Sequence, residues 1–316
     1  MPQSLVDLAR EDAFLSWFAN QGFPIQERCL SFGGFRYHQF SALFPLGDRE
    51  TTSHGRSEVR RTAALKCASE AVERRFMAEG FSTKAPFIPP ALRTSNGWAV
   101  HQDEKAARTA AYREALERHL LLKSYCHYGW AGFRLVNRIE TPDAAFFFLT
   151  SRFTTENMIS GLVVVKSPLY AGISLGYSAG ALGAEDGTAF WESAIFEALD
   201  KILALDGKPI DLSRNPGSWI TSEMKTYLES PFDLATLEIG KDAPRELAPA
   251  NPEYIQLYNL AELYGLDFPL YAAWAAGGDL IPLFSKSRLA TEEMAYLASI
   301  LARNSIRDLP ERHPVL

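Results

Sequence analysis

The sequence predicts a mixed α/β protein, with the α+β arrangement of a single domain over residues 1–316. Strand-like apolar runs and amphipathic helical patterns are interleaved along the whole chain. No stretch between them is long enough to act as a linker that divides the chain. The composition, 47% hydrophobic and 22% charged, is that of a globular protein able to bury a sizeable core.

The first part of the chain predicts a helix, a hairpin and two longer helices. The ranges are a helix over Leu5 to Ala19, strands over Glu27 to Phe32 and Phe35 to Leu43, and helices over Ser57 to Ala78 and Glu104 to Ser124. A double glycine supplies the turn of the hairpin, and a proline-rich loop separates the two longer helices.

The second part predicts three strands, a helix, a loop-rich stretch and a final helix–strand–helix succession. The strands cover Ala144 to Thr150, Ile159 to Lys166 and Tyr170 to Gly176, and the helix covers Thr188 to Ala204. After loops over 206–252 come a helix over Tyr254 to Leu263, a strand over Phe268 to Ala276, and a helix over Thr291 to Arg303.

Charge and cysteine usage exclude several classes of protein. The net charge is −6 with no basic block, so nucleic acid and anionic membrane are not expected partners. No apolar run approaches the ~20 residues of a membrane helix, and the amino terminus does not resemble a secretory signal. Cys29, Cys67 and Cys126 form no CxxC and indicate neither a zinc site nor a disulfide framework. We therefore expect a cytoplasmic protein with reduced, buried thiols.

Three predicted helices share one charged signature, in which two acids three residues apart are followed by a base. The copies are Glu70, Glu73 and Arg74, then Glu114, Glu117 and Arg118, then Glu197, Asp200 and Lys201. A glycine precedes each copy at a similar distance: Gly55, Gly97 and Gly180. Because positions i, i+3 and i+4 share a helix face, each helix presents two carboxylates and a cation together.

The ordinary explanation of such triplets is a solvated salt-bridge ladder on a helix surface. Here, however, Glu114 and Glu117 share their face with apolar residues such as Ala107 and Leu121. Carboxylates on such a face point into the protein, where an unpaired charge is costly. Mg²⁺ prefers carboxylate oxygens and bridges them to nucleotide phosphates, which Arg and Lys also bind. The pattern therefore favours a Mg-nucleotide site over a surface.

The segments before the first two acidic helices are expected to be loops. They read His54-Gly55-Arg56-Ser57 and Ser95-Asn96-Gly97. Glycine and small residues there would let backbone N–H groups approach a phosphate.

These segments together resemble the YcaO family, over about Gly55 to Lys201. The matching stretches are Gly55-Arg56-Ser57 before Ser69-Glu70-Ala71-Val72-Glu73-Arg74, Ser95-Asn96-Gly97-Trp98-Ala99 before Glu114-Ala115-Leu116-Glu117-Arg118-His119, and Gly176-Tyr177-Ser178-Ala179-Gly180 before Glu197-Ala198-Leu199-Asp200. The resemblance implies that Mg²⁺ is bound by Glu70, Glu73, Glu114, Glu117, Glu197 and Asp200. It implies that the phosphates of ATP are bound by Arg56, Lys66, Arg74, Ser95, Asn96, Arg118 and Lys201.

The resemblance also implies a reaction, in which ATP phosphorylates the oxygen of a peptide backbone amide. In a ribosomally made peptide, a Cys, Ser or Thr side chain then adds to give an azoline. Two alternatives are thioamide formation with sulfide and a non-catalytic scaffold subunit of a peptide-modifying complex. Lys66 and Asp200 depart from the family pattern, which usually has a small hydroxyl residue and Gln there, and these departures would permit the scaffold alternative.

Further expectations concern the organisation of the chain and its partners. Residues 1–50 would form an amino-terminal helix and strands, 55–204 a nucleotide-binding core, and 205–316 a carboxy-terminal part with a tail. The terminal carboxylate of Leu316 is a candidate catalytic group, as in azoline-forming members of the family. We expect a separate leader-peptide-binding partner protein to present the peptide substrate, and we expect an oligomer.

Other signals in the sequence are weaker. Gly207-Lys208 lacks the rest of a P-loop motif. Cys126 and His127 are sequence neighbours, which rarely act as a catalytic pair. Trp98 and Tyr177 would either stack on adenine or, as is commoner for aromatic residues, belong to the core.

Overall fold

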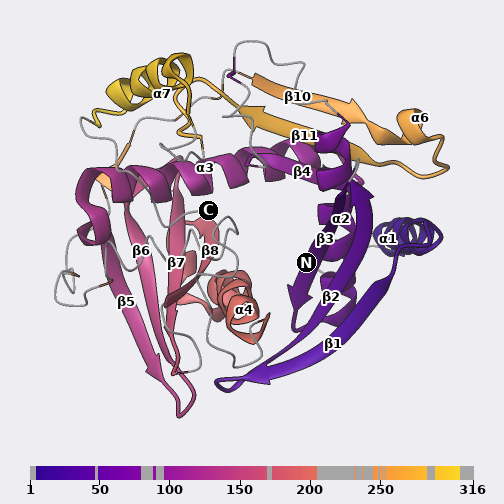
Figure 1. The fold of residues 1–316 in the computed structure, drawn as a ribbon, viewed down its shortest axis with the longest axis horizontal. Coiled ribbons are helices and arrows are strands. Elements are labelled where there is room, and N and C mark those ends of the chain that lie inside the picture. The colour runs from indigo at the N-terminus through magenta and orange to yellow at the C-terminus, as the bar shows by residue number, and fades with distance from the viewer. Residues whose placement is uncertain are drawn as a thin grey trace. The chain divides into compact units, whose positions relative to one another are not determined.

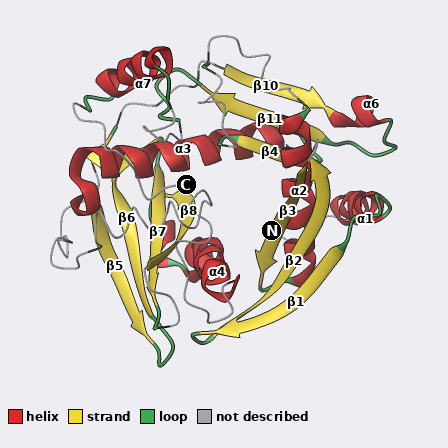
Figure 2. Ribbon diagram, viewed as in Figure 1, coloured by secondary structure: helices red, strands yellow, loops and turns green. Residues whose placement is uncertain are grey.

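The computed structural model describes residues 5–46, 49–79, 88–89, 96–168, 173–204, 232, 237, 245–247, 250, 252, 254–282 and 289–306. In this part of the chain helices and three β-sheets are combined, which confirms the predicted mixed α+β fold (Figures 1 and 2). The chain divides into two compact units, each made of several segments: 1–31, 35–115 and 252–278 in the first, and 32–34, 116–251 and 279–316 in the second. The expected single domain and its subdivision stay predictions.

The first unit contains two three-stranded sheets. One has the order β1 (Ile25–Phe32), β2 (Phe35–Leu46), β3 (Arg49–Ser57), and the other has the order β10 (Tyr254–Asn259), β11 (Tyr271–Ala276), β4 (Trp98–His101). Its helices are α1 (Leu5–Ala19), α2 (Arg60–Ala78), the short α6 (Leu260–Tyr264) and the first part of α3 (Glu104–Tyr128). Helix α2 contacts β2 and β3 of the first sheet and β4 of the second.

Helix α2 lies unusually close to strand β3. Its buried face consists largely of small residues, Ala63, Cys67, Ala68 and Ala71. A Cβ atom at Gly55 in β3 would lie 1.9 Å from the Ala63 carbonyl oxygen, so only glycine permits this approach. The segment His54 to Ser57, which the sequence predicts as a loop, is therefore a strand held against the helix.

The second unit is built on one sheet with the order β5 (Phe133–Glu140), β6 (Ala145–Thr155), β7 (Met158–Lys166), β8 (Ile173–Ala181), and β9 (Arg245–Glu246) pairs with β6. Helix α4 (Thr188–Ala204) contacts β7 and β8. The later part of α3 also contacts this sheet, since the Ser160 hydroxyl of β7 donates to the Glu117 carbonyl at 3.2 Å. Strand β7 is accordingly buried at every position but Lys166, as its continuous apolar sequence requires.

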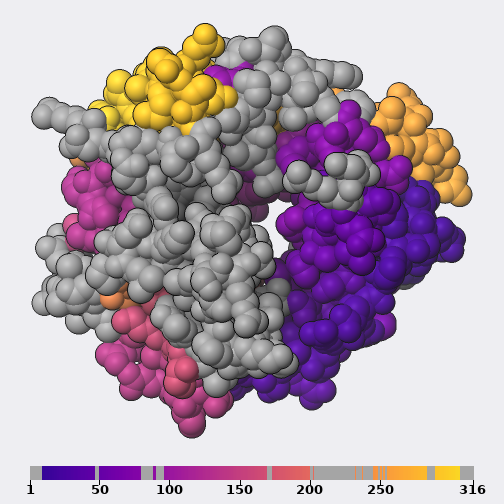
Figure 3. Space-filling model, in the orientation of Figure 1, coloured from indigo at the N-terminus to yellow at the C-terminus, as the bar shows by residue number. Residues whose placement is uncertain are grey.

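Helix α7 (Thr291–Arg303) closes the described part of the second unit. Leu297, Ile300 and Leu301 are buried, while the opposite face of the helix is exposed and visible at the molecular surface (Figure 3). The Asn304 amide then ends the helix by donating to the carbonyls of Ile300 (3.0 Å) and Asp279 (2.9 Å). Among the described residues, no helix has the length and apolarity needed to cross a bilayer.

The structure confirms most predicted elements and, besides the loop expected at His54 to Ser57, corrects one more. Helices α1, α4 and α7 have the predicted bounds, and α3 starts at the predicted Glu104. The prediction of one helix over Tyr254 to Leu263 is wrong: this stretch is strand β10, paired antiparallel with β11, followed by α6. The Asn259 side chain separates the two, because its oxygen accepts the N–H of Ala261 (3.1 Å) and starts α6. Most of the predicted loops over 206–252 lie outside the described residues.

The close approach of α4 to β8 gives the first prediction. A Cβ at Gly176 of β8 would lie 1.8 Å from the Ala194 carbonyl oxygen, whereas a Cβ at the exposed Gly187 would meet Ala184 at an ordinary 3.4 Å. We expect Gly176→Ala to lower the free energy of unfolding by about 3 kcal/mol, the upper end of typical overpacking costs. Gly187→Ala is the matched control and should change it by less than about 1 kcal/mol. Urea unfolding of both variants measures this, and equal midpoints would contradict the tight contact.

Candidate functional site

Three of the predicted acidic residues accept a hydrogen bond from the backbone of a neighbouring strand. The bonds join His54 N of β3 to Glu70 Oε2 (2.6 Å), Val100 N of β4 to Glu73 Oε1 (2.9 Å), and Tyr177 N of β8 to Glu197 Oε2 (3.1 Å). In the described part of the chain, each donor strand is the edge strand of its sheet. An edge strand leaves alternate N–H groups unpaired, and here such groups hold helix carboxylates in place.

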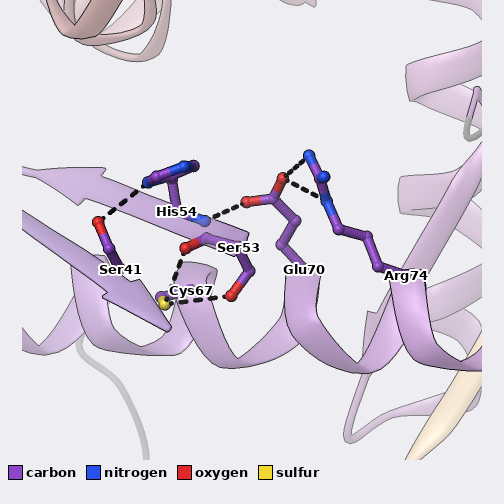
Figure 4. A network of polar contacts seen from close by, with 6 residues as sticks. All are labelled: Ser41, Ser53, His54, Cys67, Glu70 and Arg74. Atoms are coloured by element: carbon purple, nitrogen blue, oxygen red, sulfur yellow. Dashed lines mark hydrogen bonds and ion pairs between the residues drawn. The ribbon is translucent and has the colours of Figure 1, made fainter. Parts of the chain in front are cut away.

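In the first unit, Glu70 is held from two sides (Figure 4). Arg74 donates to Glu70 Oε1 through Nε (2.9 Å) and Nη2 (2.6 Å), while the His54 N–H donates to Oε2. The His54 ring in turn contacts the Ser41 hydroxyl at 3.0 Å. The Glu70 charge is therefore already compensated by an arginine and a backbone dipole.

Glu73, one turn further along α2, has a different environment. Burial raises its pKa well above the usual value, and the nearby charges of Glu114 and Glu70 raise it further, against the opposing effects of Val100 N–H and Arg74. Glu73 and Glu114 thus repel one another within the first unit, and a cation would relieve that repulsion. Carboxylate oxygens are the ligands that Mg²⁺ prefers. Among the described residues, however, no group of three or more metal-ligating side chains is assembled for a metal ion.

The second unit contains a cluster of Glu117, Arg118, Glu197 and Tyr177. Burial raises the pKa of Glu117, Arg118 opposes that shift, and Glu197 adds to it. Arg118 Nη1 lies 3.5 Å from Glu117 Oε1, and the guanidinium carbon lies 4.4 Å from the centroid of the Tyr177 ring. This cluster therefore combines two carboxylates with a cation that is fixed over an aromatic face.

The remaining predicted residues are placed as follows. Lys66 is exposed on α2, Arg56 is half-buried on β3, and the Asn96 carbonyl accepts the indole N–H of Trp274 at 3.3 Å. Ser95, Leu316 and the side chains of Asp200 and Lys201 lie outside the described residues. Helix α3 runs through both units and carries Glu114 in the first and Glu117 in the second.

The sequence patterns did not reveal the backbone donors of His54, Val100 and Tyr177. A signal was available for two of them, because His54 and Tyr177 adjoin Gly55 and Gly176, the glycines at which a strand touches its helix. The spacing of the third repeat points to Gly180 instead, where a Cβ would meet the Phe190 ring rather than helix backbone.

The weaker signals of the sequence have structural roles. Burial raises the pKa of the Cys126 thiol to about 12, and His127 Nε2 lies 3.2 Å from the Asn304 carbonyl oxygen, so the two do not form a thiolate–imidazole pair. Burial lowers the pKa of His119 to about 3, and its Nδ1 accepts the Ile281 N–H at 3.2 Å.

The two aromatic candidates are both buried. Trp98 stacks on Trp274 with ring centroids 5.4 Å apart, and one face of Tyr177 is covered by Arg118. Among the cysteines, Cys67 is buried as expected, but Cys29 is exposed.

No protein-family model and no curated protein matches this sequence. Among solved structures, the chain is similar to YcaO from Methanopyrus kandleri bound with AMPPCP and Mg²⁺, with 13% identity and a TM-score of 0.49 over 96% of this chain and 95% of that one. It is also similar to a heterocyclase in complex with substrate and cofactor, with 13% identity and a TM-score of 0.52 over 87% of this chain. The match spans 56% of the heterocyclase chain. The chain therefore shares its fold with the heterocyclase.

Proposed function

We propose that this protein is a Mg-ATP-dependent enzyme that activates a backbone amide of a peptide by phosphorylating its oxygen, with azoline formation from Cys, Ser or Thr as the outcome. The observation that carries the proposal is the buried cluster in which Arg118 Nη1 lies 3.5 Å from Glu117 Oε1 and the neighbouring Glu197 accepts the Tyr177 N–H. The shared fold supports it, because the heterocyclase of that fold was solved with substrate and cofactor.

Each cluster contributes residues of the kinds that Mg²⁺ and phosphate groups need. Glu73 and Glu114 in the first unit, and Glu117 and Glu197 in the second, supply carboxylate oxygens for Mg²⁺. Arg118 supplies a planar, permanently charged donor for phosphate oxygens. Arg74 holds Glu70, and Glu70 in turn fixes β3 against α2. A bound Mg²⁺ neutralises negative charge on the phosphates.

The remaining candidates complete the proposed binding residues. Arg56, Lys66, Asn96, Ser95 and Lys201 are phosphate contacts, Asp200 is a further Mg²⁺ ligand, and the terminal carboxylate of Leu316 is a catalytic group.

The proposed reaction is driven by the transfer of the γ-phosphoryl group of ATP to the amide oxygen. The thiol or hydroxyl of the substrate adds to the amide carbon and loses its proton, and the former carbonyl oxygen takes the γ-phosphoryl group from ATP. Phosphate then leaves with that oxygen while the amide nitrogen loses its proton, which gives the azoline, ADP and inorganic phosphate. The protein contributes position and charge, since the amide oxygen becomes a good leaving group only when phosphorylated.

The first test of this proposal is Mg-dependent ATP binding by calorimetry. Glu117→Gln removes a carboxylate charge from the second cluster and should weaken ATP binding in the presence of Mg²⁺ at least about tenfold, the usual cost of losing one charge-assisted contact. Glu104→Gln is the matched control, because Glu104 lies on the same helix but is exposed and paired with Arg108. ATP binding that is equally strong in both variants would contradict the role of Glu117. A folded wild-type chain that binds no ATP would favour the scaffold alternative.

A second prediction concerns stability without the metal. Because the pKa of Glu73 is raised in the folded protein, the proton on Glu73 stabilises the fold below the ordinary carboxylate range, and this stabilisation is lost as pH rises through the raised value. Glu73→Gln resembles the protonated form and keeps an oxygen for Val100 N–H. In the absence of Mg²⁺, we expect its Tm to exceed that of the wild type by a few degrees at neutral pH. The difference should shrink as the pH falls.

Thermal unfolding with excess Mg-ATP provides the control for this experiment. The ligand should raise the Tm of the wild type and have little effect on Glu73→Gln, because a ligand stabilises only the folded protein that binds it. A lower Tm for Glu73→Gln at neutral pH without ligand would show that the ionised carboxylate stabilises the fold.

A third prediction distinguishes the two chemical outcomes. With a Cys-, Ser- or Thr-containing peptide, Mg-ATP and, where needed, a leader-binding partner, azoline formation removes the mass of one water per ring. Thioamide formation with added sulfide instead replaces one oxygen by one sulfur. Mass spectrometry of the peptide separates them, and ATP turnover without either change would contradict amide activation of that peptide.

A further inference from the structure

We propose that Tyr177 is a positioning residue of the proposed nucleotide site, holding Arg118 with its ring and Glu197 with its backbone. The inference rests on the proposed function and adds a residue that neither binds Mg²⁺ nor touches phosphate. Tyr177 and both of its partners lie in the second unit, so the contacts that matter belong to this unit alone.

The two faces of strand β8 explain how one residue contacts two helices. Residues of a strand alternate between the faces of the sheet. Gly176 and Gly180 face α4, since a Cβ on either would meet that helix. Tyr177 consequently faces the other way, where its ring meets Arg118 of α3. Its N–H donates to the Glu197 carboxylate of α4 at 3.1 Å.

The ring contact fixes a cation that would otherwise have many conformations. Arg side chains lose rotamer entropy when they are immobilised. At 4.4 Å from the ring centroid, with Tyr177 only 3% exposed, the guanidinium lies in a shielded cation–π contact. Arg118 Nη1 also lies 3.5 Å from Glu117 Oε1, so both a ring and a carboxylate contact the guanidinium.

The backbone contact adds a constraint that is independent of the ring. Gly176 lets β8 approach α4 closely, and the next N–H along the strand meets the Glu197 carboxylate. A shift of β8 would therefore displace the proposed phosphate-binding cation and a proposed Mg²⁺ ligand together.

The test compares Tyr177→Phe, Tyr177→Trp and Tyr177→Leu for binding of ATP and of adenosine, which has no phosphates. The aromatic variants keep the cation–π contact and should bind ATP nearly as the wild type does. Tyr177→Leu keeps the backbone N–H but loses the ring, and its affinity for ATP should fall about tenfold while that for adenosine is unchanged. Tyr264→Leu is the matched control, because Tyr264 contacts Arg75 in the same way at 5.7 Å outside the proposed site.

A nucleotide-free measurement separates this inference from the proposed function and does not require any variant of Tyr177 to fold. In the NMR spectrum of the wild type, the Arg118 side-chain protons, assigned by comparison with Arg118→Lys, should be shifted upfield by the ring current of Tyr177. An absent shift would overturn the inference, as would undiminished ATP binding by folded Tyr177→Leu, or an equal loss of ATP and adenosine binding. An upfield shift in a wild type that binds no ATP would overturn the proposed function instead.

Discussion

The structure depends on one recurring interaction, the hydrogen bond from an edge-strand N–H to a glutamate on the helix beside it. The carboxylate is a strong acceptor, so the bond is charge-assisted, and it is short at Glu70 (2.6 Å) and Glu73 (2.9 Å). It forms only where the helix lies close to the strand, which Gly55 and Gly176 allow at two of the three places. This one bond therefore fixes both the register of the helix against the sheet and the position of the carboxylate.

The same interaction explains how buried acids are tolerated before any ligand binds. Glu70 has an arginine and an N–H, and its charge is satisfied. The charges of Glu73 and Glu117 are less well compensated by neighbouring groups, and burial raises the pKa of each carboxyl. Residues that are unfavourable for the isolated fold are common where a protein binds a charged ligand, because the ligand restores the balance. The clusters therefore have the character that the proposed cation binding requires.

The sequence was sufficient for the long helices and for the acidic signature, because both follow from local spacing. It was insufficient for β5, whose residues are mostly exposed and show little alternation, and for β10, whose apolar spacing suits a helix as well as a strand. The four-residue β4 depends on its pairing with β11, which is distant in sequence. The strand character of His54 to Ser57 depends on pairing with β2 and on the close approach of α2 at Gly55. The carboxylates could be identified from their helix positions. Their backbone donors connect different elements of the fold, and only the glycines next to His54 and Tyr177 pointed to two of them.

The placement of these carboxylates also affects association between molecules. A free strand edge invites pairing with another chain, and proteins usually block it with charge or with a covering element. In the described part of this chain three edge strands donate an N–H to a glutamate, and two of these glutamates, Glu73 and Glu197, are proposed Mg²⁺ ligands. A substitution that shortens one of them, such as Glu to Ala, uncovers a backbone donor at the rim of a sheet as well as removing a ligand. Ligand-binding capacity and resistance to edge-to-edge aggregation are thus encoded in the same residues, and selection on either one constrains the other.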